Sequence, residues 1–172
     1  MQPAADDPAT TAALTAYRGG ALRWVAGGAV AGVVAVLGGV AAAAVADETG
    51  RRVPVMGLAV VGLLFVAPVA VAIGVGSLLR ARRWALAMAA TPWVHGVLRA
   101  AGPAVLSFEH GGPDEPEAVR LQLETTTLWR ARLVQGLDGG AVRAVPVGGG
   151  EWVFTADGLG TLLGAREPRG RR

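Results

Sequence analysis

The chain contains no cysteine and no lysine, and its 172 residues include only two histidines and two serines. Without cysteine there is no disulfide, no thiolate nucleophile and no cysteine-ligated zinc or iron–sulfur centre. All sixteen basic residues are arginines, and with the abundant alanine, glycine and valine they indicate a GC-rich genome. Charged residues make up 17% of the chain, against about 25% in soluble domains, and the mean hydropathy is +0.45. This composition argues against an ordinary soluble globular protein.

Charge is also missing from two long stretches in the first half of the chain. Residues 24–46 and 53–79 contain 23 and 27 residues without a single charge. As helices they would be about 35 and 40 Å long, enough to cross a hydrocarbon core of about 30 Å. The six residues between them make a tight turn, so we expect an antiparallel transmembrane hairpin over 18–83, with spans at about 22–46 and 53–79.

The arginines predict how this hairpin is oriented. The turn between the spans holds two of them, whereas the flanking segments hold six: Arg18, Arg23, Arg80, Arg82, Arg83 and Arg99. Because flanking arginines stay on the cytoplasmic side, both termini are expected in the cytoplasm of a multi-pass plasma-membrane protein. A competing interpretation takes the first span as a signal peptide cleaved after Ala46. Its charged lead and apolar run are longer than those of an ordinary signal peptide.

Small residues form a stripe along the first span. Gly28, Gly32, Ala35 and Gly39 recur at spacings of four, three and four, which places them on one helix face. Glycine and alanine allow helix backbones to approach closely in membranes. We interpret the stripe as a helix-packing face within the hairpin. Self-association, contact with a membrane-protein partner, and chance in an alanine-rich chain remain alternatives.

Arg80, Arg82, Arg83 and Trp84 follow the second span directly. Their position predicts a membrane interface, with the arginines as a stop-transfer signal and the tryptophan in an aromatic belt. Recognition of anionic lipid headgroups is an alternative use of the same arginines. Nucleic-acid binding is not expected, because no basic–aromatic motif accompanies them. The lipid bilayer is therefore the one partner that the sequence indicates directly.

The rest of the chain divides into a folded domain and two tails. Residues 1–17 and the basic residues 167–172 are expected to be disordered, and 84–166 to form a small antiparallel β-rich domain, either a sheet or a partly open barrel. Residues 125–137 fit a helix slightly better than a strand. Predicted strands cover 93–100, 104–109, 118–124, 141–147, 151–155 and 161–166. The expected large core residues are Trp93, Phe108, Trp129, Trp152 and Phe154.

No set of residues predicts catalysis. His95, Glu109 and His110 are the obvious metal-ligand candidates, but adjacent strand residues point to opposite faces and cannot easily share an ion. Gly148-Gly149-Gly150 lacks the lysine and the helix of a phosphate loop and is typical of a hairpin turn. There is no Gly-x-Ser-x-Gly motif. We expect no enzyme activity, no metal and no cofactor.

The lysine-free composition, the Arg80-Ala81-Arg82-Arg83 stop and Pro92-Trp93 before a strand-rich tail resemble small two-span integral membrane proteins of actinobacteria. The resemblance implies a membrane location and no activity. The whole sequence predicts an α+β membrane protein that presents a small cytoplasmic interaction or regulatory domain. An accessory subunit of a transport or channel complex is the first alternative, and a membrane-tethered enzyme is the second.

Overall fold

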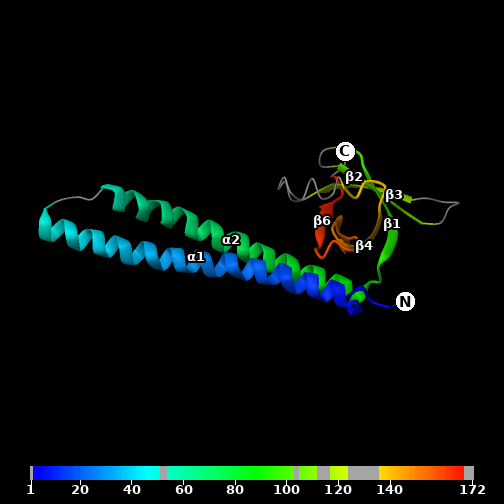
Figure 1. Ribbon diagram of the computed structural model, residues 1–172, viewed down its shortest axis with the longest axis horizontal. Coiled ribbons are helices and arrows are strands. Elements are labelled where there is room, and N and C mark those ends of the chain that lie inside the picture. The colour runs from blue at the N-terminus through cyan, green and yellow to red at the C-terminus, as the bar shows by residue number, and fades with distance from the viewer. Residues whose placement is uncertain (1, 51–53, 103–104, 112–116, 124–135, 169–172) are drawn as a thin grey trace. The chain divides into compact units, whose positions relative to one another are not determined.

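A computed structural model of the chain describes residues 2–50, 54–102, 105–111, 117–123 and 136–168. Two long apolar helices, α1 (Pro8–Thr49) and α2 (Pro54–Ala90), are followed by six strands (Figure 1). The chain divides into two units, one of Met1–Tyr17 with Ala81–Arg172 and the other of Arg18–Arg80. The β-rich unit is therefore discontinuous in sequence, because it includes both the first residues of α1 and the last turns of α2.

The six strands form a closed antiparallel barrel with the order β1-β2-β3-β6-β5-β4. Its strands are β1 (Val94–Ala100), β2 (Val105–His110), β3 (Glu117–Leu123), β4 (Ala141–Gly148), β5 (Glu151–Thr155) and β6 (Leu163–Arg166). Two three-stranded meanders, β1–β3 and β4–β6, join where β1 pairs with β4 and β3 pairs with β6. The sequence was consistent with either a sheet or a partly open barrel. Both of those would have exposed edge strands, which a closed barrel does not have.

Alternating side chains explain why these segments form strands. In β3, Leu121 and Leu123 are buried, whereas Arg120 and Gln122 between them are exposed. The Gly148-Gly149-Gly150 run is the β4–β5 turn, and all three glycines have positive φ angles, which residues with a Cβ rarely adopt. The predicted strands match the observed ones within one or two residues. Most of the helix predicted for 125–137 lies outside the described residues.

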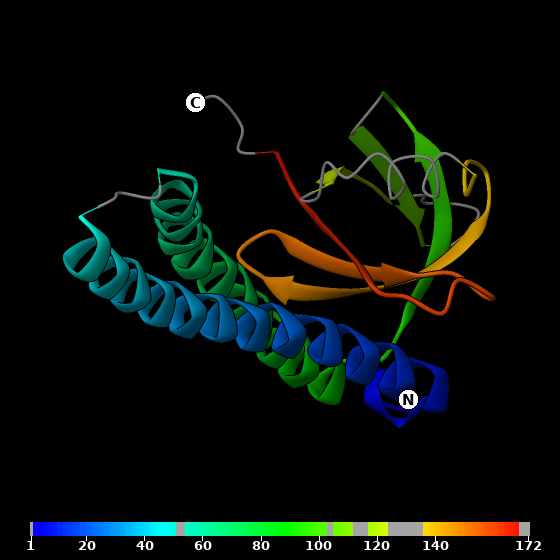
Figure 2. The ribbon, with the colours of Figure 1, turned by 60° about the vertical axis from the view of Figure 1, so that its left-hand side comes forward.

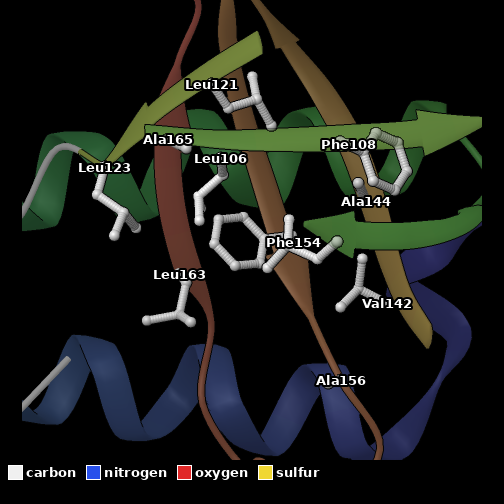
Figure 3. Close-up of a cluster of buried hydrophobic side chains, with 11 residues drawn as sticks. Leu106, Phe108, Leu121, Leu123, Val142, Ala144, Phe154, Ala156, Leu163 and Ala165 are labelled. Atoms are coloured by element: carbon white, nitrogen blue, oxygen red, sulfur yellow. The ribbon is translucent and has the colours of Figure 1, made fainter. Parts of the chain in front are cut away.

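The barrel interior is filled by aliphatic side chains around two phenylalanines (Figure 3). Phe108 on β2 and Phe154 on β5 are fully buried, as predicted, and Trp152 packs against this core from a half-buried position. Gly96 on β1 makes room for Phe108, because a Cβ at Gly96 would lie 2.6 Å from the Phe108 ring. Trp129 lies outside the described residues.

A second hydrophobic core lies between the outer barrel wall and helical segments of the same unit. Val145, Val153 and Leu162 from the barrel pack with Trp84 and Met88 from the end of α2, and residues of the N-terminal segment complete this core: Ala4, Ala13, Leu14 and Tyr17. The prediction that residues 1–17 are disordered is therefore wrong. Ala4–Asp6 form a 3-10 helix and Pro8 begins α1, and these segments cover apolar barrel residues that water would otherwise contact.

In the unit of Arg18–Arg80, α1 and α2 lie side by side and antiparallel in both views (Figure 1, Figure 2). The two backbones approach closely at Gly28, where a Cβ would lie 2.8 Å from the Ala67 carbonyl oxygen, and at Gly74, where it would lie 2.8 Å from the Ala21 carbonyl oxygen. Ala35, seven residues after Gly28 and on the same face of α1, is fully buried. Large apolar side chains on the remaining helix surfaces are exposed, among them Val30, Leu37, Val40, Val55, Leu58, Phe65 and Val69.

Candidate functional site

Arg143 on β4 links three segments that are far apart in the sequence. Its guanidinium contacts the Asp7 carboxylate through Nη1 at 3.1 Å and the Asp157 carboxylate through Nη2 at 2.9 Å. The guanidinium carbon also lies 5.7 Å from the ring centroid of Trp93, a cation–π distance. One side chain therefore connects the N-terminal segment, the β5–β6 connection and the α2–β1 connection. We call this group of four residues the Arg143 cluster.

Asp7 is held at the N-terminus of α1. Its Oδ1 accepts a 3.0 Å hydrogen bond from the Ala9 N–H, and its Oδ2 accepts one from the Thr10 hydroxyl, so Asp7 is the N-cap and Pro8 the first helical residue. Partial burial raises the pKa of Asp7, but these hydrogen bonds and the charge of Arg143 outweigh it and lower the pKa below its ordinary value. The sequence contained this signal, since Asp-Pro is a typical helix start.

An open cleft of about 540 Å³ lies beside the Arg143 cluster. Its walls come from the N-terminal segment, the α2–β1 connection and the barrel: Gln2, Pro3, Asp6, Asp7, Pro8, Pro92, Trp93, His95 and Arg143. The volume falls within the range of small-ligand sites, about 300–1,000 Å³. Its polar groups are two carboxylates, the Gln2 amide, an imidazole and a guanidinium already paired with two aspartates. The indole N–H of Trp93 is buried. The lining therefore suits polar contacts and contains no nucleophilic hydroxyl.

A buried carboxylate marks a second polar contact in the barrel unit. Glu151 at the start of β5 is 3% exposed, and its Oε1 accepts a 2.8 Å hydrogen bond from the Trp84 indole N–H. Its Oε2 lies 3.4 Å from Nη1 of Arg83. The prediction of Trp84 as a membrane-interface aromatic is therefore wrong, because its side chain is only 2% exposed and lies in the second core. Nothing in the local sequence signals that Glu151 is buried.

The other predicted site residues fall in three places. Gly28, Gly32, Ala35 and Gly39 lie on the side of α1 that faces α2, with Gly32 and Gly39 in looser contact than Gly28. Arg82 and Arg83 lie on the exposed face of the last turns of α2. Arg80 belongs to the helical unit.

The candidate metal ligands are not brought together. Glu109 pairs with Arg99 at 2.9 Å, whereas the His110 ring lies 5.2 Å from Phe108 and 6.2 Å from Trp152. His95 lines the open cleft. Across the described ranges, no three histidine or carboxylate side chains form a group that could hold a metal.

The end of the barrel domain also differs from the prediction. Residues 167–172 were expected to form a disordered basic tail, but Glu167 is tied to the barrel. Its N–H donates a 2.7 Å hydrogen bond to the Gly150 carbonyl, and its carboxylate accepts one of 2.8 Å from the Trp152 indole. Residues 169–172 lie outside the described residues.

Comparison of the chain with protein-family models, curated proteins and solved structures found no match. The chain's own geometry defines a class: two helices long and apolar enough to cross a membrane, followed by a small closed antiparallel barrel with a polar cleft.

Proposed function

We propose that the chain is an integral membrane protein whose helical hairpin anchors a small non-catalytic interaction domain at the cytoplasmic face of the plasma membrane. The observation that carries this proposal is the exposure of large apolar side chains on both long helices. Val55 is 77% exposed and Phe65 is 73% exposed. Water-exposed apolar surface of this extent is unusual for a soluble monomer, whereas a bilayer would cover it.

The positions of the charged and polar residues along the two helices support the same interpretation. Between Arg23 and Asp47, and again between Arg52 and Arg80, the chain has no charged residue. Ser77 is the one residue with a side-chain hydroxyl in these two stretches. That hydroxyl donates a 2.8 Å hydrogen bond to the Ile73 carbonyl within α2. No ionisable group is therefore exposed at bilayer depth, which favours an anchor over a pump or an ion pathway.

Two features of the barrel unit support an interaction role: it has an open cleft, and several of its buried polar groups are paired with one another. The Arg143 guanidinium is paired with Asp7 and Asp157, and Glu151 is bonded to Trp84 and Arg83. These groups stabilise the contacts between segments. A nucleophile beside a base that is held by a third group, the geometry expected of a hydrolase, is not among the contacts of the described residues.

The absence of cysteine allows a direct test of topology. Single substitutions Asp47→Cys, in the turn between the helices, and Gln122→Cys, on the outer barrel wall, would be compared in intact cells with a membrane-impermeant maleimide. Both side chains are exposed, so both should react after detergent lysis. We expect Asp47→Cys alone to react in intact cells, and the protein to stay in the membrane pellet at alkaline pH. Labelling of Gln122→Cys from outside would overturn the cytoplasmic assignment, and release at alkaline pH would overturn the anchor.

A further inference from the structure

The last turns of α2 have two different faces within the barrel unit. Ala81, Trp84 and Met88 are at most 2% exposed and pack on the barrel. At 100° per residue, Arg82, Arg83 and Leu86 lie on the opposite side of the helix, and all three are exposed. Leu86 is 64% exposed, and no other leucine, valine, methionine, phenylalanine or tryptophan in the described part of the barrel unit is exposed.

We propose that Arg82 and Arg83 on this face bind the headgroups of anionic phospholipids in the leaflet that holds the anchor. The proposal rests on the proposed membrane location of the chain. It adds a lipid class that the face would recognise, because two adjacent guanidinium groups directly after an apolar stretch suit the phosphates of anionic lipids.

The distance along the helix supports this occupant. Arg82 and Arg83 follow Leu79, the last residue of the apolar stretch, by three and four residues, or about 4.5 and 6 Å of helix. The headgroup layer on each side of a bilayer is about 5–8 Å thick, from the difference between total and hydrocarbon thickness. The arginines therefore fall at headgroup depth, whereas Leu86, seven residues or about 10.5 Å beyond Leu79, lies past this layer.

Among the described residues, one of these two arginines is paired with a carboxylate and the other is not. The sequence has no aspartate or glutamate between Glu48 and Glu109. Arg83 reaches Glu151 at 3.4 Å while its side chain stays 60% exposed. Arg82 has no carboxylate within ion-pair distance among the residues that the structure describes. Arg82 is therefore the guanidinium most available to a phosphate.

The proposal is tested with the full chain purified in a mild detergent that contains equimolar phosphatidylglycerol and phosphatidylcholine. The measured quantity is the ratio of the two lipids that co-purify, determined by mass spectrometry. We expect phosphatidylglycerol to be enriched on the unaltered chain, and Arg82→Gln to reduce the enrichment about five-fold, the equivalent of about 1 kcal/mol for one arginine at a membrane surface. Arg82→Lys should retain most of it. Arg120→Gln, which removes one exposed arginine from the outer side of β3, is the matched control and should change nothing.

Added inorganic phosphate distinguishes a lipid from a free anion. We expect it to reduce the enrichment no more than chloride at equal ionic strength; specific competition by phosphate would overturn the lipid assignment. Equal lipid ratios for the unaltered chain and Arg82→Gln would also overturn it. In parallel, the same proteins are reconstituted in pure phosphatidylcholine vesicles and washed at alkaline pH. Retention there with no lipid preference overturns this inference alone, whereas release overturns the proposed anchor.

Discussion

The indole N–H of Trp84, on the last turns of α2, donates a 2.8 Å hydrogen bond to the carboxylate of Glu151 at the start of β5. Sixty-seven residues separate the two in sequence, and both side chains are almost completely buried. A buried carboxylate is costly unless it is paired and hydrogen-bonded, so Trp84 and Arg83 together allow Glu151 to remain there. This contact ties the end of α2 to the barrel.

Removing the donor should destabilise the barrel unit. Trp84→Phe keeps an aromatic ring in the second core but removes the hydrogen bond that the indole donates to Glu151 Oε1, and losing a hydrogen bond to a buried charged group typically costs about 1–3 kcal/mol. We expect a lower thermal unfolding midpoint for the full chain in detergent. Trp24→Phe, at a position that is 55% exposed, is the control and should leave the midpoint unchanged. Equal midpoints for both variants would show that the Trp84–Glu151 bond contributes nothing.

The ion pair of Asp7 with Arg143 should make stability depend on pH in the acidic range. The pKa of Asp7 is lowered in the folded chain, so its contribution is complete above the unfolded value of about 3.9 and disappears as the pH falls through the lower folded pKa. Asp7→Asn keeps the helix cap but not the charge. We expect the unaltered chain to be more stable than Asp7→Asn at neutral pH, with the difference vanishing in strong acid.

This difference is measured from unfolding midpoints over a series of pH values. Asp6→Asn is the matched control, because Asp6 is exposed and has no ion pair among the described residues. A difference for Asp7→Asn that stays constant down to the lowest pH would contradict an electrostatic origin.

The close approach of the two long helices should make Gly28 intolerant of even a methyl group. A Cβ there would lie 2.8 Å from the Ala67 carbonyl oxygen and 2.8 Å from Val71, and overpacking of this kind costs about 1–3 kcal/mol. We expect Gly28→Ala to lower the unfolding midpoint in detergent. Gly27→Ala, with nothing within 4 Å, should be neutral or stabilising, since alanine favours a helix by about 1 kcal/mol over glycine. Equal unfolding midpoints for the two variants would show that the close approach at Gly28 does not contribute to stability.

The N-terminal segment should be required for a stable barrel unit. Residues 2–17 cover Val145, Val153 and Leu162, and the rings of Tyr17 and Trp84 are 5.0 Å apart, so a short linker can join Tyr17 to Ala81. We expect a chain of 2–17, linker and 81–168 to be monomeric and cooperative in unfolding. Residues 81–168 alone should aggregate, as size-exclusion chromatography would show. A monomeric, cooperative 81–168 fragment would show that the second core is dispensable.

The sequence by itself determined the elements that have a local signal. Charge-free stretches of 23 and 27 residues predicted the long helices, and the alternation in residues 119–123 together with glycine-rich turns predicted the strands. The position of Gly28 and Ala35 on one helix face also followed from spacing. Each of these patterns is set by the helical or strand period over a few residues, so no knowledge of distant segments was needed.

Only the tertiary structure decided which distant segments meet. Closure of the barrel depends on the pairing of β1 with β4 and of β3 with β6. The sequence of each of these strands does not indicate which strand it pairs with. The N-terminal segment is too short and too polar to predict as folded, yet it is ordered because Val145 and Val153 supply the apolar surface that it covers. Trp84 has the sequence position of an interfacial tryptophan but is buried, because it packs with Val145 and Val153 in the second core. Glu151, sixty-seven residues away, accepts the hydrogen bond of its indole N–H there.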